Sequence, residues 1–444
     1  MFVANCGYAL NKPPAYDSGQ PMSDLSREPR LRWLMIGLAF FATVINYLDR
    51  QTLSVVAPVL LDQFHMNSVD YSRVVSAFLL AYTLMNGVSG PLIDRLGTKA
   101  GYALSMLWWS ASAILHVFAR GTLSLGICRF LLGMGEAGNW PGAVKVVAEW
   151  FPERERALAS GIFNSGATIG VIVAPPLIVL IVQKWGWQAA FWSIGALGFV
   201  WLLVWLLTYR TSLASENDTP KRPPQPVAKL LRTRFVWSFT LSKIFLDPAW
   251  YFYVFWFPEY LKQVHKFNLA AIGKYAWIPF FVAALGNVFG GFLSPAFINR
   301  GMETAKARKL AVSVCAVLML FPIPAVLSSS PWVATGCVAL AMAGYTGANV
   351  TQLAFVVDAF GKESVASVWG FASMGAGFGG MLFTLIAGWV IQHFSYSPVF
   401  IGFGLIPLIC STILWTLTGP LPMRDAPEAT SVAAGEGLKT SARR

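Results

Sequence analysis

Charged residues lie inside two apolar stretches of this 444-residue chain. Asp49 and Arg50 are adjacent in NYLDRQTLS (residues 46–54), and Arg129 and Glu136 lie in RFLLGMGEAGNWPG (residues 129–142). A charged side chain at the centre of a membrane costs about 2.5–3.5 kcal/mol, so residues of this kind usually mark the path of an ion or a substrate. An arginine there can bind a carboxylate through two hydrogen bonds, and a desolvated Asp or Glu can take up a proton.

The spacing limits which of these residues can pair. Neighbouring helix residues project about 100° apart, so Asp49 and Arg50 do not pair with each other as i,i+4 residues would. Arg129 and Glu136 share one helix face, about 10 Å apart along the axis. The four residues predict an anion site linked to proton binding. The alternative is a buried ion network that is permanently satisfied.

Two further groups of polar residues interrupt apolar segments. Lys243 and Asp247 have i,i+4 spacing and can neutralise each other, and Pro248 predicts a broken helix. Tyr251 belongs to an aromatic cluster that is either a packing surface or a platform for a sugar-like ligand. Later segments carry polar residues that line a cavity or simply bond between helices, namely Thr346, Asn349, Gln352, Trp369 and Ser373.

These residues must be positioned by membrane-spanning helices. The chain is 56% hydrophobic and 12% charged, and apolar runs of about 20 residues, enough to span a bilayer, recur along it. Only helices satisfy the backbone in such runs, which predicts an all-α polytopic membrane protein. We expect twelve spans, near residues 33–59, 71–93, 101–119, 122–148, 157–182, 187–208, 235–261, 272–298, 309–327, 332–357, 365–392 and 397–418.

The spans fall into two sets of six. The predicted organisation is a cytoplasmic segment (1–32), a six-helix bundle (33–208), a cytoplasmic linker (209–234), a second six-helix bundle (235–418) and a cytoplasmic tail (419–444). Most of the 33 Lys and Arg residues then lie in the termini and inner loops, which places both termini in the cytoplasm and the chain in the inner (plasma) membrane. The net charge of +12 therefore indicates a face beside anionic lipid, and no nucleic-acid partner is expected.

Other functional classes find little support in the sequence. Four of the five cysteines lie in spans without a CxxC motif, and the four histidines are scattered, so we expect no metal site. The chain has no Walker-type glycine loop and no Ser–His–acid arrangement at span ends. We therefore expect no cofactor and no enzymatic activity.

The two halves of the chain resemble each other. At an offset of 209, Gly161, Gly166 and Gly170 align with Gly370, Gly375 and Gly379; Gln183, Phe191 and Gly195 align with Gln392, Phe400 and Gly404. Glycine is common where membrane helices pack closely, but the shared offset favours a duplication. Paired halves predict a central site at their interface that opens alternately to each side.

The loop GPLIDRLGTKAG (residues 90–101) matches the signature of the major facilitator superfamily between spans two and three. The matching positions are Gly90, Asp94, Arg95, Gly97 and Lys99. Charges there can latch one face shut, and the family pattern implies that the aspartate faces the start of the eleventh helix. The second half has Pro295 and Ala296 in place of the acid, which predicts an asymmetric gate; an ordinary loop is the alternative.

Several motifs together resemble the organic anion:cation symporters of this superfamily: NYLDR, GPLIDRLGTK, RFLLGMGEAGNWPGA and EWFPERERALASGIFNSG. IFLDPAWYFYVFWFPEYL and SVASVWGFASMGAGFGGMLF resemble the hexuronate transporter branch. The resemblance implies a major facilitator fold, with twelve transmembrane helices in two pseudo-symmetric six-helix bundles. It also implies proton-driven uptake of a carboxylated solute, a sugar acid such as glucuronate or galacturonate.

The resemblance also implies roles for individual residues. Arg50 would bind the substrate carboxylate, Asp49 and Glu136 would carry protons, and Arg129 would bias the protonation of Glu136. Tyr47 and Tyr82 match positions that line the cavity. Sugar-acid relatives outside the hexuronate branch can carry a glutamine after the glycine that corresponds to Gly166; here that residue is Ala167, and Asn164 is the nearby polar candidate.

Three functions remain open at this point. Proton-coupled symport by a monomer fits the residues best, with the small organic anion, protons and the lipid bilayer as partners. An anion exchanger or an efflux transporter is the alternative within transport. A membrane nutrient sensor that does not transport is the third.

Overall fold

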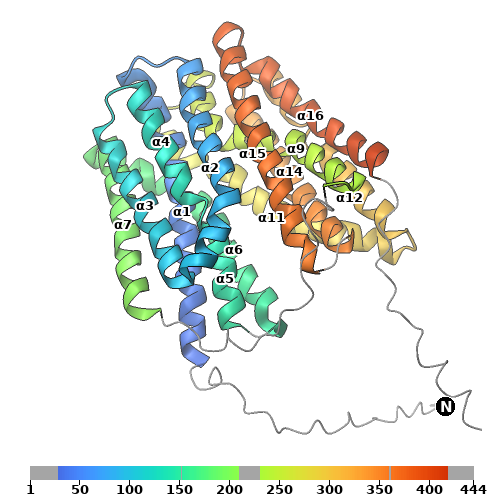
Figure 1. The fold of residues 1–444 in the computed structure, drawn as a ribbon. Helices are drawn as coiled ribbons and strands as arrows, with labels where there is room; N and C mark the ends of the chain where they lie inside the picture. The colour runs from blue at the N-terminus through green and yellow to red at the C-terminus, as the bar shows by residue number, and fades with distance from the viewer. Residues whose placement is uncertain (1–28, 152, 210–230, 360–361, 419–444) are drawn as a thin grey trace, which may run out of the picture.

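The computed structural model describes residues 29–151, 153–209, 231–359 and 362–418, and this part of the chain is built from helices without a strand. The predicted segment 1–32 and linker 209–234 lie largely outside these residues, and the predicted tail 419–444 lies wholly outside them. Figure 1 shows two groups of helices side by side, the first formed by the N-terminal half and the second by the C-terminal half.

The first bundle is formed by six helical rods. Its elements are α1 (Pro29–Gln63), α2 (Ser68–Leu96), α3 (Thr98–Leu115) with the short η2 (His116–Phe118), α4 (Thr122–Glu136), α5 (Asn139–Trp150), α6 (Glu153–Trp185) and α7 (Trp187–Thr208).

The second bundle repeats this arrangement. Its elements are α9 (Arg234–Gln263), α10 (Leu269–Tyr275), α11 (Ile278–Asn299), α12 (Thr304–Leu318), α13 (Pro322–Leu327), α14 (Pro331–Ala359), α15 (Lys362–His393) and α16 (Tyr396–Leu417).

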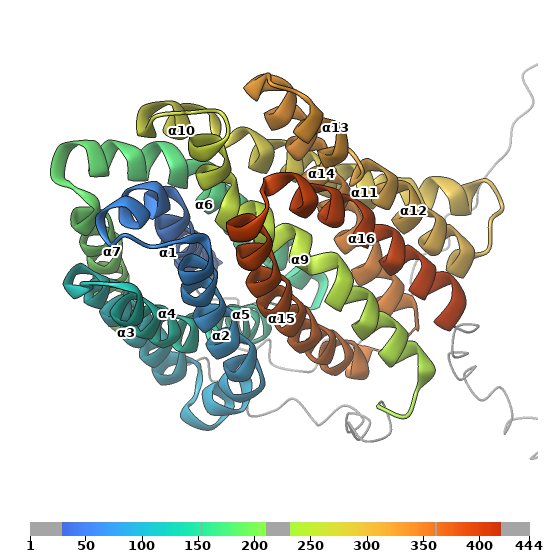
Figure 2. The ribbon, with the colours of Figure 1, turned by 90° about the horizontal axis from the view of Figure 1, so that it is seen from above.

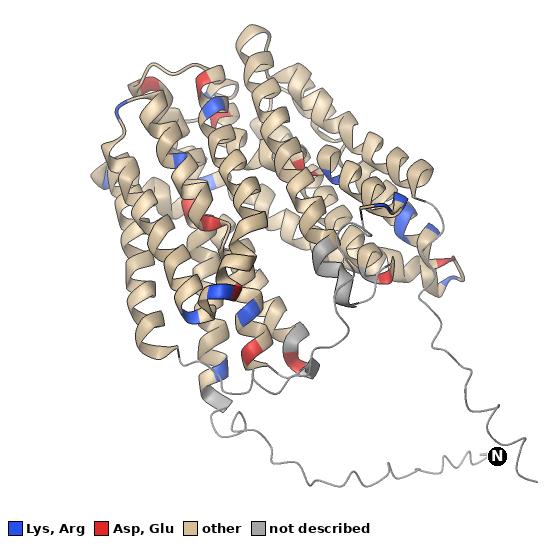
Figure 3. Ribbon diagram, in the orientation of Figure 1, with Lys and Arg blue, Asp and Glu red and all other residues tan. Residues whose placement is uncertain are grey.

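Each predicted span coincides with one helix or with two consecutive helices, in agreement with the twelve-helix fold. Among the described residues, nine segments are long and apolar enough to cross a membrane by length and composition. The remaining three spans are α3, the α4–α5 pair and α9, and each of them carries ionisable side chains (Figure 3). Charge is not the whole reason, because α1 holds Asp49 and Arg50 and is still among the nine, and α4 and α5 have only 15 and 12 residues.

Two local expectations differ from the structure. The fourth span breaks between α4 and α5, directly after Glu136, where Gly135 and Gly138 lower the helix propensity of the chain. The prediction that Pro248 breaks the seventh span is wrong, because α9 runs without interruption through Pro248 and Pro258. A proline removes one backbone hydrogen bond, and the packing of α9 against α15 and α16 holds the helix together.

The sequence repeat corresponds to equivalent helix packing. Gly170 of α6 lies against the Val44 carbonyl of α1, and Gly379 of α15 lies against the Ile244 carbonyl of α9; a Cβ at either glycine would collide with that backbone. Small residues let membrane helices approach this closely. The internal duplication is therefore visible as the same α1–α6 and α9–α15 contact in each bundle.

The two bundles meet at one end of the molecule. We call the end at which α1 ends and α2 begins the far end, and the opposite one the terminal end. The principal contacts between bundles join α1 to α9, α2 to α15, and α6 to α10 and α11, and Figure 2 shows α2 beside α15. Ser54 donates a 2.6 Å hydrogen bond to the Val254 carbonyl, and Tyr71 donates one of 2.7 Å to the Phe255 carbonyl.

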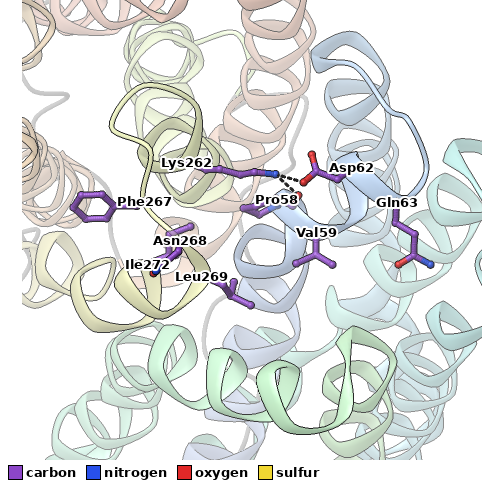
Figure 4. Close-up of a pocket in the computed structure, with 9 residues that line it drawn as sticks. All are labelled: Pro58, Val59, Asp62, Gln63, Lys262, Phe267, Asn268, Leu269 and Ile272. Atoms are coloured by element: carbon purple, nitrogen blue, oxygen red, sulfur yellow. Dashed lines mark hydrogen bonds and ion pairs between the residues drawn. The ribbon is translucent and has the colours of Figure 1, made fainter.

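An ion pair joins the bundles at the surface of the far end. Lys262 Nζ lies 2.6 Å from Asp62 Oδ2 and also 2.6 Å from the Pro58 carbonyl oxygen, so α9 is tied to the end of α1 (Figure 4). A pocket of about 450 Å³ opens beside this pair. It is lined by Pro58, Val59, Asp62, Gln63, Lys262, Phe267, Asn268, Leu269 and Ile272.

The terminal halves of α2 and α15 are packed differently. Along the α2–α15 contact, Gly388 lies against Ser72 and Gly377 against Thr83. Beyond that point, a Cβ on Gly87 or Gly90 of α2, or on Gly370 of α15, would meet no atom within 4 Å. The structure is therefore closed between these two helices at the far end and open between them toward the terminal end.

A large side chain at the α2–α15 contact of the far end should keep the two bundles apart. In Gly388→Leu the new side chain collides with Ser72, and strain of about 1–3 kcal/mol from overpacking shifts a two-state population about 5- to 150-fold. We expect faster modification of a Ser76→Cys reporter, whose native hydroxyl bonds the Met381 carbonyl across the interface, by a membrane-impermeant maleimide in a chain whose native cysteines are replaced. Gly402→Leu is the matched control, since a Cβ at Gly402 meets open space. Equal labelling rates in both variants would show that this contact does not close the far end.

Candidate functional site

A buried ion pair joins α1 to α4 inside the first bundle. Arg50 Nε lies 2.7 Å from Glu136 Oε2, and the side chains are 9% and 0% exposed. Glu136 is the last residue of α4, directly before the break in the fourth span. The structure thus brings together the predicted carboxylate anchor and one predicted proton carrier.

Aromatic rings surround the Arg50 guanidinium. Its central carbon lies 4.4 Å from the ring centre of Tyr82, 5.1 Å from that of Tyr47 and 5.4 Å from that of Phe78. A cation over an aromatic face is stabilised, by about 2 kcal/mol when it is desolvated. Tyr47 and Tyr82 are therefore next to Arg50, and Phe78 adds a ring that the sequence analysis did not select.

Asp49 and Arg129 lie deep in the same bundle, and each is 1% exposed. Within the described residues, neither the Asp49 carboxylate nor the Arg129 guanidinium has a hydrogen-bond partner. The Arg129 guanidinium lies 5.9 Å from the ring centre of Phe191. The four charges are therefore not a fully satisfied network in this conformation, because only the Arg50–Glu136 pair is hydrogen-bonded.

A small cavity lies where Arg50 meets the second bundle. Its volume is about 10 Å³, room for about one water molecule, so a larger ligand requires the lining side chains to move. Tyr47, Arg50 and Gln51 line it from α1, Val171 from α6, and Trp250, Tyr251, Val254 and Phe255 from α9. Arg50 and Tyr251, which are far apart in the sequence, therefore share one cavity at the bundle interface.

The second bundle has a polar centre of its own. Lys243 Nζ lies 2.7 Å from Asp247 Oδ1 and 2.7 Å from Asn349 Oδ1, and 5.1 Å from the ring centre of Trp369. The Tyr345 hydroxyl donates a 3.3 Å hydrogen bond to Asp247 Oδ1. The predicted residues Asn349 and Trp369 thus gather around a Lys–Asp pair.

The other predicted binding residues lie elsewhere. Gln352 is fully buried and donates to Ser242 Oγ at 2.8 Å, which joins α14 to α9 inside the second bundle. Thr346 donates to the Ala283 carbonyl, as expected of an interhelical hydrogen bond. Ser373 is half-buried on α15. Asn164 is exposed on α6 and donates to the Ser160 carbonyl of its own helix, so the structure does not join it to Arg50.

The predicted gate motif forms the turn between α2 and α3. Asp94 lies 2.9 Å from Lys145 of α5, in the same bundle, whereas the family pattern implies a contact with the start of the eleventh helix. Gly97 has φ +78°, a conformation that side chains disfavour. Arg95 is exposed, Lys99 is half-buried, and its carbonyl accepts from the Trp205 indole; Gly90 faces open space.

The second bundle has a charged pair at the corresponding place, although its loop lacks the acid. Arg308 of α12 lies 2.9 Å from Asp358 of α14 and also donates to Ser294 Oγ. The acid therefore comes from a different helix. This pairing of distant residues could not be predicted from the loop sequence.

Three residues of these two sites, Lys243, Asp247 and Phe78, were not selected as binding residues in the sequence analysis. The i,i+4 spacing of Lys243 and Asp247 predicts their pairing but not the contacts of this pair with Asn349 and Trp369. Phe78 has no distinguishing pattern in a chain with 32 phenylalanines. Among the described residues, no group of three or more His, Cys, Asp or Glu side chains is placed to hold a metal ion.

Comparison with solved structures places the chain in a known fold. A bacterial homologue of the human lysosomal transporter Spinster, in an inward-facing and unoccupied conformation, superimposes with a TM-score of 0.69; the match has 20% identity and covers 87% of this chain and 95% of that one. The nucleoside transporter NupG superimposes with a TM-score of 0.70, at 14% identity, over 88% of this chain and 100% of that one.

Sequence comparison gives closer relatives. A hexuronate transporter of Escherichia coli (strain K12) is 31% identical over 418 residues, which cover 90% of this chain and 97% of the relative. A galacturonate transporter of Dickeya chrysanthemi is 34% identical over 329 residues, covering 70% and 95%. A probable galactarate/D-glucarate transporter of Bacillus subtilis is 28% identical over 429 residues, covering 89% and 93%.

The family model of the Major Facilitator Superfamily matches residues 39–384 and 307–443, which together span both bundles. The paired bundles, the α2–α3 motif and the buried charges at the bundle interface agree with this match. The chain is a multi-pass membrane transporter, not an enzyme, and it belongs to the Major Facilitator Superfamily.

Proposed function

We propose that this protein is a proton-coupled symporter that imports a sugar acid, most simply a hexuronate such as glucuronate or galacturonate. The observation that carries the proposal is the Arg50–Glu136 pair, a buried guanidinium held by a carboxylate beside the bundle interface. The names of the relatives support a sugar-acid substrate.

The chemistry of the pair suggests how proton and substrate are coupled. Arg50 is neutralised by Glu136, and an unpaired buried charge costs about 3–5 kcal/mol. When Glu136 takes up a proton, Arg50 loses its counter-ion and gains affinity for another carboxylate. The substrate supplies that carboxylate, which the planar guanidinium binds through two parallel hydrogen bonds. Proton and anion are thus bound together because each makes the other less costly to bury.

Asp49 is the second proposed proton carrier, and Arg129 tunes both acids. The Asp49 carboxylate is fully buried without a hydrogen-bond partner in the described part of the chain, and an unpaired charge is costly to bury. Arg129, a cation buried in the same bundle, would offset this cost when Asp49 is ionised. The balance between them sets which acid gives up its proton first.

The bundle contacts fit alternating access. With both termini in the cytoplasm, as the distribution of Lys and Arg indicates, the far end is the outer face. The conformation described here then releases substrate to the cytoplasm, and parting of α2 from α15 at the far end admits it from outside. Asp94 pairs with Lys145 in this conformation. In the opposite state it would leave this pair and form a contact that closes the inner face.

Uptake into proteoliposomes tests the proposal directly. With a pH gradient, acid outside, we expect labelled glucuronate or galacturonate to accumulate above its equilibrium level, and collapse of the gradient by an ionophore should abolish the accumulation. Accumulation that ignores the gradient would contradict symport. Exchange of preloaded substrate without any gradient-driven uptake would favour the anion exchanger instead.

Replacement of Arg50 tests the carboxylate anchor. Arg50→Lys keeps the charge but loses the fork that binds a carboxylate with two hydrogen bonds, and one charge-assisted hydrogen bond is worth about 1.5–3 kcal/mol. We expect the apparent KM for substrate to rise about 10- to 100-fold.

The matched control is Arg300→Lys, at an exposed position after α11, which should leave KM unchanged. If Arg50→Lys keeps the KM of the parent protein, Arg50 does not bind the substrate carboxylate.

Replacement of Glu136 tests the coupling role. Glu136→Gln keeps the shape of the side chain and an oxygen that accepts from Arg50, but it cannot exchange a proton. We expect gradient-driven accumulation to fall to the equilibrium level while exchange of external for internal substrate persists. Both rates are measured in the same vesicles.

Glu303→Gln, at an exposed site where Glu303 pairs with Lys306, is the control and should accumulate substrate normally. Uphill transport that survives in Glu136→Gln would remove Glu136 from the proton path and leave Asp49 as the carrier.

A further inference from the structure

The Lys243–Asp247 pair in α9 has no role in the coupling scheme, although it is buried as deeply as the Arg50–Glu136 pair. Its side chains are 3% and 9% exposed, and 2.7 Å separates Nζ from Oδ1. Lys243 Nζ has three protons and donates to Asp247 and Asn349, so one N–H remains available. Asp247 accepts from Lys243 through Oδ1, so Oδ2 remains available as an acceptor beside it. A donor next to an acceptor is what two neighbouring sugar hydroxyls bind.

The internal repeat places this pair on the same helix face as part of the Arg50 site. The equivalent contacts of Gly170 with Val44 and of Gly379 with Ile244 relate α1 to α9 by 200 positions. Asp247 then corresponds to Tyr47, which lines the cavity with Arg50. Lys243 corresponds to Thr43, which accepts a hydrogen bond from Asn139 of α5, just as Lys243 contacts Asn349 of α14.

Aromatic side chains connect the pair to the Arg50 cavity. Tyr345 donates to Asp247 and stacks on Trp250, with ring centres 5.2 Å apart. Trp250 lines the cavity together with Arg50. Arg50 and the Lys243–Asp247 pair are thus the two polar ends of one region, one from each bundle. The Trp250 and Tyr345 rings lie along this region and connect its two ends.

The charges at the two ends differ once a proton is bound. Protonation of Glu136 leaves Arg50 without a counter-ion, so the first end gains one positive charge. The second end stays neutral, because Asp247 already neutralises Lys243 at 2.7 Å. A ligand with one carboxylate is then fully compensated by Arg50. A ligand with a carboxylate at each end would place its second charge beside the Asp247 carboxylate, with which Lys243 is already paired. Like charges so placed repel strongly in a low-dielectric site.

We propose that the Lys243–Asp247 pair is the second subsite of the transporter, which binds the hydroxylated end of a sugar acid and restricts the substrate to acids with a single carboxylate. This inference rests on the proposed function of the Arg50 site. Asn349 and Tyr345 hold the pair in place, and the Trp369 ring beside Lys243 offers an apolar face to the C–H groups of the sugar. Asp247 selects against dicarboxylates in two ways: it repels a second carboxylate, and it already forms the ion pair with Lys243. Specificity of this kind comes from an unfavourable contact with the wrong ligand.

Galacturonate and galactarate form a suitable probe pair, since they share their hydroxyl configuration and differ in having one or two carboxylates. Inhibition of labelled galacturonate uptake in proteoliposomes by each unlabelled compound gives a selectivity ratio. In the parent protein galactarate should inhibit at least about 10-fold more weakly, the effect of about 1.4 kcal/mol.

Asp247→Asn frees Lys243 and adds one positive charge at the second subsite. We expect the ratio to shift at least about 10-fold toward galactarate, a gain that general damage to the protein would not produce. Lys243→Met combined with Asp247→Asn removes both charges and should retain the preference for one carboxylate. Asp247→Glu restores the pair and should also retain it, with measurable uptake even if Asp247→Asn folds poorly.

Equal inhibition by the two compounds in the parent protein would overturn the inference while leaving sugar-acid transport intact. An unchanged ratio in Asp247→Asn that still transports galacturonate would overturn it as well. Inhibition by neither compound would overturn the proposed function and this subsite together.

Discussion

The structure depends on the cost of keeping a guanidinium inside a membrane. Arg50 is buried, so it requires a counter-charge within hydrogen-bonding distance, and Glu136 supplies one at 2.7 Å. Three aromatic rings reduce the remaining cost. A buried pair of this kind contributes little net stability, because the desolvation of both ions offsets their attraction. Such a pair matters because the buried guanidinium always requires a counter-charge. A transporter could meet this requirement either with its own carboxylate or with a carboxylate of the substrate.

Helix packing decides where the pair lies. Gly170 lets α6 approach α1 closely, and this contact presents Arg50 toward α9. Glu136 ends α4, where the fourth span breaks. The principal contacts between the bundles in the described residues, which include Lys262 with Asp62, then lie on one side of the site. A pair of rigid bundles in contact at one end, with the charged residues between them, is the arrangement in which rocking exposes one site to each side in turn.

The duplicated bundles carry unequal chemistry. Each bundle buries four charged residues: the first buries Asp49, Arg50, Arg129 and Glu136, and the second buries Lys243, Asp247, Glu259 and Lys309. In the second, Lys243 and Asp247 pair with each other on the same helix, whereas Arg50 of the first pairs with Glu136 of a different helix. At the terminal end the two bundles again use different residues for a similar ion pair, Asp94 with Lys145 and Arg308 with Asp358. The glycine contacts that set the backbone thus recur in both halves, whereas the buried charged residues and their partners differ between them.

Hydropathy, the repeat and the loop motif were enough to predict a twelve-helix major facilitator fold. The length of an apolar segment and the spacing of its glycines are local properties of the sequence, and they decide whether a helix can span a bilayer and pack closely there. Residue type also identified Arg50, Asp49, Glu136 and Arg129 as exceptional, since a charge in an apolar segment is visible without a structure. The partners of these residues were not visible: the sequence could not show that Glu136 holds Arg50, that Gln352 turns into the second bundle, or that α9 continues through Pro248. Those outcomes depend on which helices lie side by side, and hydrogen bonds of about 3 Å are settled only when the tertiary packing brings residues from distant parts of the chain together.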